Sequence, residues 1–231
     1  MHSALSWLRK NPHAWLMGYW AFYLFGFFSL EQLDPEYTII HCFIDDLIPF
    51  NEWFVIPYCL WYLWMPGTML YLFFKEKTDY CRLCFIMFVG MTVAMLTYLV
   101  WPNGLDLRQP ILRQNVLCQL VELLRGIDTP TNVCPSIHIS STVSIAIVGL
   151  RCKLFRGNLP VHALIWAMTI LITLSTLFLR QHSVIDVVAG AALSLVLMIP
   201  AYRIQWEKIF PEIAPSASKA IRHPTQNQTT F

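Results

Sequence analysis

Long apolar runs separated by short polar segments dominate the chain. The runs occupy residues 14–30, 53–74, 83–100, 136–150, 161–179 and 184–202. Because a helix rises about 1.5 Å per residue, roughly 20 apolar residues cross the roughly 30 Å hydrocarbon core of a bilayer. The pattern therefore predicts an all-α fold, a bundle of six transmembrane helices.

The fourth run is the shortest and begins with polar side chains. It has only 15 residues, and hydroxyls stand at positions 140, 141, 142 and 144. Such a helix is only about 22 Å long, less than a standard span. We therefore expect its first turn to begin below the membrane surface, inside the bundle.

The connections between the runs differ in character. Residues 31–52 carry six acidic side chains and no lysine or arginine, and apolar positions from Ile40 to Ile48 follow a helical stripe. This predicts a short helix in the membrane interface. The connection 101–135 is polar and too long for a tight turn, as functional loops often are. Residues 75–82 and 151–158 are expected to be short basic loops.

We expect one domain, residues 1–202, followed by a disordered tail at 203–231. No internal repeat is present, and 56% of the residues are hydrophobic while 13% are charged. Soluble domains usually carry about a quarter charged residues. The composition excludes an ordinary soluble protein. The expected partners are the bilayer and a lipid substrate, and no nucleic acid.

The basic residues predict how the bundle is oriented. Twelve of the 16 lysines and arginines lie in the N-terminal segment, the two short basic loops and the tail. By the positive-inside rule both termini are cytoplasmic, so the long third connection faces outward. Short cytoplasmic loops without extra domains favour a bacterial inner (plasma) membrane.

Two histidines and one aspartate suggest chemistry at the outer face. His182 and Asp186 are four residues apart, which places them on one helix face. The carboxylate can hold one imidazole nitrogen and leave the other free to attack. His138, at the start of the fourth run, supplies a second imidazole. The three residues predict a nucleophile, its orienter and a general acid.

The predicted surroundings of these histidines suit a phosphate. Both begin helices at the outer face, and helix N-termini favour anions. Arg180 precedes His182 by two residues, and Arg108 lies in the long connection. An arginine fork matches phosphate oxygens. The pattern therefore predicts a phosphate-ester site at membrane depth, and hence a lipid substrate.

The motifs resemble those of the type 2 phosphatidic acid phosphatase superfamily. Cys134-Pro-Ser136-Ile-His138 resembles its second motif, and Ser175 with His182 and Asp186 resembles its third. The segment ending at Arg108 resembles the first. The resemblance implies that His182 becomes phosphohistidine, that His138 protonates the leaving group, and that Ser136 contacts the phosphate. It also implies catalysis without a metal or cofactor.

The chain departs from that family's pattern at several positions. Ile137 replaces a glycine, Trp101 a lysine, Gln109 a proline and Thr176 an arginine. The basic side chains that usually surround the phosphate in that family are therefore fewer in this chain, and we hypothesise that Arg180 supplies the missing charge.

Three functions follow as hypotheses. The favoured one is a phosphatase that removes phosphate from a lipid phosphate or a lipid diphosphate. The second is a lipid phosphotransferase of the sphingolipid-synthase type, which passes the phospho head group to an alcohol. The third is a lipid-binding bundle without turnover.

Two further patterns lie outside these motifs. His41 and Asp45 form a second His-x3-Asp pair without a Pro-Ser-x-His partner, and we expect interfacial packing there. Cys118 and Cys134 both lie in the outward connection, where a disulfide is one alternative and free thiols the other.

Overall fold

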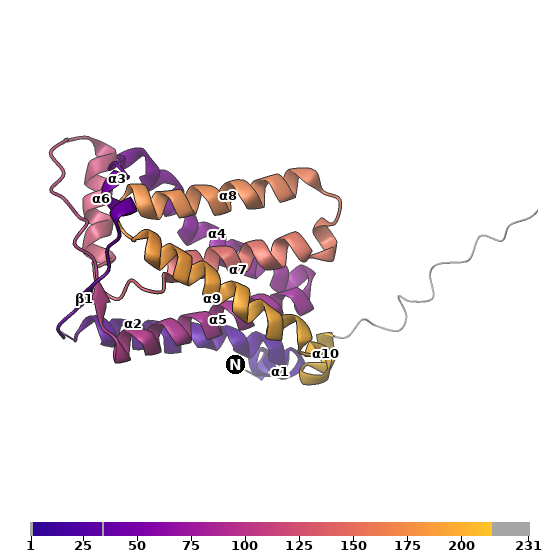
Figure 1. The fold of residues 1–231 in the computed structure, drawn as a ribbon. Coiled ribbons are helices and arrows are strands. Elements are labelled where there is room, and N and C mark those ends of the chain that lie inside the picture. The colour runs from indigo at the N-terminus through magenta and orange to yellow at the C-terminus, as the bar shows by residue number, and fades with distance from the viewer. Residues whose placement is uncertain (1, 34, 214–231) are drawn as a thin grey trace, which may run out of the picture.

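The computed structural model describes residues 2–33 and 35–213, and most of this part of the chain is helical. The long helices lie side by side, roughly along one direction (Figure 1). They are α4 (Val55–Lys75), α5 (Lys77–Val100), α7 (Ile137–Arg151), α8 (Leu159–Phe178) and α9 (Val184–Arg203). The predicted all-α class is therefore confirmed in its coarse form.

Three of these helices, α5, α8 and α9, are long and apolar enough to cross a membrane. The apolar α7 has 15 residues, as the short fourth run predicted. Helix α4 has 21 residues but contains Pro66 and several polar aromatic side chains. The structure thus supports a helical membrane protein, while the six-span arrangement stays a prediction.

The N-terminal run does not form the single helix that we expected over 14–30. It is divided between a 3-10 helix, η1 (Pro12–Gly18), and α2 (Tyr19–Glu31), after the short α1 (His2–Lys10). Helix α2 has only 13 residues. It packs along α5, where Tyr19 stacks on Phe88 at 4.3 Å and its hydroxyl lies 2.8 Å from that of Thr92.

The predicted basic loop at 75–82 is wrong. Helix α5 begins at Lys77, so Glu76 alone separates it from α4. Arg82 donates to Asp79 at 2.6 Å, three residues earlier on the same helix. An acidic residue in the first turn with a basic partner at this spacing favours helix, which explains the early start.

The polar connections gather at the end of the bundle where α7 and α9 begin (Figure 1). Strand β1 (Thr38–Ile39) pairs in parallel with β2 (Asn103–Gly104), with Thr38 opposite Asn103. In place of the interfacial helix expected from Ile40 to Ile48, the structure has the shorter helix α3 (Phe43–Leu47). The 3-10 helix η2 (Glu52–Phe54) follows it.

The long connection contains a helix that we did not predict, α6 (Val116–Ile127). Asn115 caps it by accepting a hydrogen bond from the Cys118 N–H at 2.8 Å. Val121 and Leu124 are buried against α4. The connection is therefore an ordered cover over this end of the bundle.

The expected disordered tail is ordered in its first part. Helix α10 (Trp206–Ile209) and η4 (Pro211–Ile213) follow α9, and Trp206 and Ile213 are buried in the main core. His13 Nδ1 lies 3.0 Å from Glu212 Oε1, which joins the N-terminal segment to this end. The remainder of the predicted tail lies outside the described residues.

Helix α7 lies at the centre and packs against α5, α8 and α9. Its contact with α9 uses small polar side chains. Ser140 and Ser194 hydroxyls lie 2.9 Å apart, and Ser144 donates to Ser194 at 3.2 Å. This close packing brings the first turns of α7 and α9 together.

Candidate functional site

His182 stands two residues before α9 and is held by the carboxylate predicted for it. Its Nδ1 lies 3.3 Å from Asp186 Oδ2, and its side chain is nearly buried. The same oxygen accepts a hydrogen bond from the Ser183 N–H at 2.8 Å, as part of a capping box. The helix start therefore fixes both the carboxylate and the imidazole that it orients.

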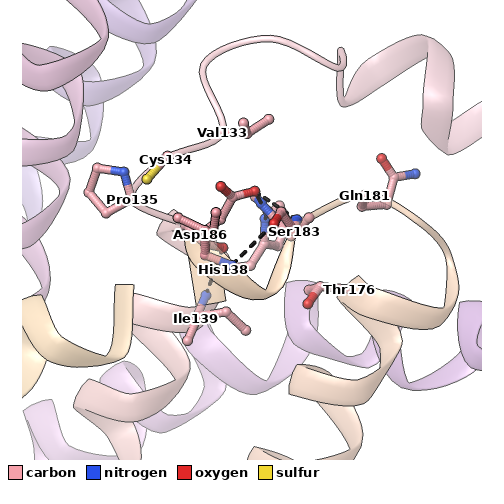
Figure 2. A network of polar contacts seen from close by, with 12 residues as sticks. Val133, Cys134, Pro135, His138, Ile139, Thr176, Gln181, Ser183 and Asp186 are labelled. Carbon is pink, nitrogen blue, oxygen red and sulfur yellow. Dashed lines mark hydrogen bonds and ion pairs between the residues drawn. The ribbon is translucent and has the colours of Figure 1, made fainter. Parts of the chain in front are cut away.

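His138, 44 residues earlier on the first turn of α7, meets His182. Its Nδ1 lies 3.3 Å from His182 Nε2, and the two rings approach edge to face. Among the described residues, His138 Nε2 has no hydrogen-bond partner although it is buried. Figure 2 shows the segments around His138 and Asp186 converging on this point.

Gly190 explains why the two helix starts come so close. A Cβ built on it would lie 2.5 Å from the Ser136 carbonyl oxygen, which no side chain tolerates. The Ser136 N–H also donates to the Asp186 carbonyl at 3.2 Å. Backbone contact between α7 and α9 thus sets the separation of the histidines.

Ser136 is fully buried and caps α7. Its Oγ accepts from the Ile139 N–H at 3.3 Å, and it does not line the neighbouring cavity. The structure therefore gives this residue a helix-capping contact, and the predicted phosphate contact stays a prediction.

The two arginines have different places. Arg108 donates hydrogen bonds to the Gln181 side-chain oxygen and to the Asp128 carbonyl. Gln181 directly precedes His182 in the chain, so Arg108 lies close to the histidine pair without contacting it. Burial lowers the pKa of Arg108 to about 10, so its guanidinium is still charged at neutral pH. The charge lies directly behind Gln181.

Arg180 does not reach the histidines. Its guanidinium donates to the carbonyls of Leu107, at 3.3 Å, and Ile48, at 3.1 Å. It therefore ties the two polar connections to the end of α8. The structure does not bring Arg180 to the position that our hypothesis required, because these carbonyls occupy its charged end.

A cavity of about 270 Å³ opens beside both histidines. No lysine or arginine is among the described residues that line it. Its polar lining includes Asp128 and Gln181, and its wall is chiefly aromatic. The aromatic residues are Trp20, Tyr23, Phe27, Phe28, Tyr58, Trp61, Tyr62 and Tyr98.

Gln181 is a site residue that the sequence did not reveal. It is 2% exposed, its oxygen accepts from Arg108, and its Nε2 has no hydrogen-bond partner among the described residues. Gln181 and His182 both line the cavity. A buried donor without a partner is costly, so it is suited to an incoming acceptor such as a phosphate oxygen. Its only sequence signal is its place beside His182.

Asp45 was also missed as a site residue. It is 3% exposed and accepts hydrogen bonds from the Ser183 hydroxyl, at 2.7 Å, and the Val184 N–H, at 2.9 Å. Burial alone would raise the pKa of Asp45, but these bonds and one from Cys42 together lower it. Asp45 thus anchors the start of α9 from the N-terminal part of the chain.

The second His-x3-Asp spacing does not lead to a hydrogen bond between His41 and Asp45. His41 Nε2 instead lies 3.0 Å from Asp46 Oδ1 at an exposed position. The short α3 turns the two neighbouring carboxylates to opposite sides, so that one faces α9 and the other faces solvent.

Neither metal nor disulfide chemistry is visible in the described part of the chain. It contains no group of three His, Cys, Asp or Glu side chains placed to hold a metal. Cys118 and Cys134 are both buried as free thiols, and Cys134 packs with Ile40, Leu105, Leu107 and Val133.

Comparison of the chain with protein-family models, with curated proteins and with solved structures found no match. The geometry of the site and its motifs therefore carry the functional conclusion.

Proposed function

We propose that the protein is an integral-membrane enzyme that hydrolyses a lipid phosphate ester through a phosphohistidine on His182, as in the type 2 phosphatidic acid phosphatases that its motifs resemble. One observation carries this proposal. His182 lies between a carboxylate at 3.3 Å from one ring nitrogen and a second imidazole at 3.3 Å from the other. This is the arrangement that a nucleophile, its orienter and a general acid require.

In the proposed first step, a phosphate group enters between the two imidazoles. His182 Nε2 attacks phosphorus while Asp186 holds the Nδ1–H, so a P–N bond forms as the bond to the lipid oxygen breaks. His138 gives its proton to the departing alkoxide. In the second step His138 takes a proton from water, the water oxygen bonds to phosphorus, and inorganic phosphate leaves His182.

Three features would stabilise the negative charge on phosphorus-bound oxygens. The first turns of α7 and α9 lie beside the histidines, and Gln181, whose buried Nε2 has no hydrogen-bond partner among the described residues, lines the same cavity. Arg108 polarises this amide from behind through the Gln181 oxygen. Fixed donors of this kind supply most of the stabilisation in phosphoryl transfer.

The membrane arrangement that accompanies this function is also a proposal. Six spans would come from η1 together with α2, and from α4, α5, α7, α8 and α9, with both termini cytoplasmic and the histidines on the outer face. The three helices long and apolar enough to cross a bilayer support it in part.

The test is phosphate release from a panel of lipid phosphates by the purified protein in detergent, with EDTA, beside His182→Ala. We expect release to survive EDTA and to fall by at least about a thousandfold in His182→Ala. His41→Ala is the matched control, since His41 pairs with a carboxylate at an exposed position. It should keep the parent rate. A folded His182→Ala protein as active as the parent would refute the function.

Transfer to an alcohol is the second candidate, and the cavity wall favours it. Tyr58 and Trp61 lie against His138, with ring centroids 5.0 and 4.3 Å away. An apolar wall at the position from which water must attack also suits an alcohol. Product analysis with added alcohols decides: a phosphate monoester of the added alcohol supports transfer, whereas free phosphate alone excludes it.

A further inference from the structure

A second pocket lies at the same end of the bundle as the histidines but is separate from their cavity. It has a volume of about 180 Å³ and shares no lining residue with that cavity. Arg113, Arg125 and Arg180 line it, together with Phe50 and the segment 109–112. No acidic side chain is among the described residues that line it. The pocket is therefore strongly basic.

Carboxylates near the pocket neutralise only part of its charge. Arg113 donates to both carboxylate oxygens of Glu52, at 3.0 and 2.9 Å. Within the described part of the chain, Arg125 and Arg180 form no ion pair and donate to carbonyls instead. Burial lowers the pKa of Arg125; Glu122 opposes this, and the charge of Arg180 adds to it, with a net lowering. The guanidinium groups of Arg125 and Arg180 therefore lie close enough to repel each other.

Most N–H groups of Arg125 and Arg180 have no acceptor among the described residues. A guanidinium has five N–H donors. Arg125 donates once, to the Gln109 carbonyl at 2.9 Å, and Arg180 donates twice. In both residues Nε is buried, and no described group accepts from it. Buried donors without acceptors are costly, and the guanidinium fork matches phosphate oxygens. The pair is therefore suited to an anion with several acceptor oxygens.

The surface around the pocket is apolar although it is exposed. Leu112, which lines the pocket, is 91% exposed, and Trp53, next to Glu52 in the chain, is 65% exposed. The guanidinium of Arg125 lies 5.4 Å from the ring centre of Phe50. Tryptophan and aliphatic side chains beside arginines are typical of the boundary between membrane and water. This surrounding favours an anion that is attached to acyl chains over an anion that is free in solution.

We infer that this pocket binds the phosphate group of an anionic membrane lipid between Arg125 and Arg180, with the acyl chains along Leu112 at the edge of the bilayer. The phosphate oxygens would accept from both guanidinium groups and relieve their repulsion. Sites for drug-sized ligands begin at about 300 Å³, so this smaller pocket holds a head group rather than a whole lipid. The inference goes beyond the proposed function, because it needs a bilayer but neither the phosphohistidine nor turnover.

The test is native mass spectrometry of the purified protein in detergent, titrated separately with dioleoyl phosphatidylglycerol and dioleoyl phosphatidylcholine. These lipids differ only in the head group, and only the first has a net negative charge. We expect the parent to bind phosphatidylglycerol at least about tenfold more tightly. Arg125→Gln and Arg180→Gln should each lower this preference by about fivefold.

The two variants protect the test against a folding defect. Arg125→Gln gives up one hydrogen bond to the fold, whereas Arg180→Gln gives up two that join separate segments. If Arg180→Gln does not fold, Arg125→Gln still decides. A preference in Arg125→Gln equal to that of the parent overturns the inference, as does equal affinity of the parent for both lipids.

Arg156→Gln is the matched control. It removes the same charge, but Arg156 is exposed in the connection between α7 and α8 and does not line the pocket. Its preference should equal that of the parent. A fivefold loss in this variant too would show a general charge effect and overturn the inference.

Three further outcomes identify the site and the source of the phosphate. His182→Ala should bind phosphatidylglycerol as the parent does, and loss of binding would place the lipid in the histidine cavity and overturn the inference. Inorganic phosphate in about hundredfold excess should leave the lipid bound, because it has no acyl chains; displacement at equal concentration would overturn the lipid as occupant. If the lipid preference holds while no lipid phosphate is hydrolysed, the phosphatase function fails and this inference stands.

Discussion

Asp45 offers a direct test of how the N-terminal part of the chain supports the site. Its carboxylate accepts hydrogen bonds from Ser183, Val184 and Cys42 at 2.7, 2.9 and 2.8 Å. Two of these donors form the first turn of α9, next to His182. In Asp45→Ala all three donors lose their acceptor, the Ser183 hydroxyl in a buried position and the other two in partly buried positions.

The size of the effect follows from the burial of these groups. A hydrogen bond to a charged group is worth about 1.5–3 kcal/mol, and a buried donor left unpaired costs about 1–3 kcal/mol. The three losses are not additive, because water and small shifts recover part of the energy. We expect Asp45→Ala to lower the free energy of unfolding by about 3–5 kcal/mol, and Asp45→Asn, which keeps one acceptor oxygen, by about 1–2 kcal/mol.

The effect should depend on pH. The pKa of Asp45 is lowered in the folded protein, so the charged form contributes stability above the unfolded pKa of about 4. This contribution is lost as the pH falls through the lower folded value. The difference in stability between the parent and Asp45→Asn should therefore be full at pH 7 and shrink below about pH 4.

The assay is unfolding of the purified protein in mixed micelles, followed by circular dichroism, with phosphate release measured in parallel. Asp46→Ala is the matched control, because the neighbouring carboxylate has a 64% exposed side chain. We expect it to change stability by less than about 0.5 kcal/mol. In Asp45→Asn, kcat should fall by about 10- to 100-fold as His182 loses its fixed position. Equal stability of Asp45→Ala and Asp46→Ala would refute the reasoning.

Three further predictions concern the neighbouring contacts. Gly190→Ala should lower the free energy of unfolding by about 1–3 kcal/mol and reduce turnover, because its Cβ would lie 2.5 Å from the Ser136 oxygen. The control Gly126→Ala, whose Cβ would meet nothing within 4 Å, should stabilise α6 by up to about 1 kcal/mol. Equal unfolding curves for the two variants would contradict the steric role of Gly190. Gln181→Glu should raise KM for lipid phosphates by about tenfold or more, since it replaces a hydrogen-bond donor with an anion. Inhibition by inorganic phosphate should weaken in parallel. An unchanged KM would exclude a contact between Gln181 and the phosphate. Asn103→Ala should lower the free energy of unfolding in micelles by about 2–4 kcal/mol. This buried side chain accepts hydrogen bonds from two backbone N–H groups, at 3.0 and 2.8 Å, and donates to two carbonyls. A change below about 0.5 kcal/mol would show that these four hydrogen bonds do not stabilise the fold.

The sequence determined the features that depend on local spacing. Residues four apart share a helix face, which is why the contact between His182 and Asp186 could be predicted from their numbers alone. The bounds of α7, α8 and α9 follow their apolar runs to within a few residues. The run over 14–30 is divided between η1, which starts at Pro12, and α2. The loop expected over 75–82 was wrong because the Asp79–Arg82 pair favours helix against the polar pattern.

Only the tertiary structure decided what surrounds the histidines. Asp45 binds Ser183 across 138 positions of the chain, and Arg108 binds Gln181 across 73, separations at which no local period operates. The same holds for Arg180, which is near His182 in sequence but directs its charge to carbonyls of other segments. Helix period fixes which side chains share a face, whereas the packing of α7 on α9 through Gly190 fixes which faces meet. The contact between His182 and Asp186 could therefore be predicted from the sequence, whereas the groups that hold the histidines and shape the cavity could not.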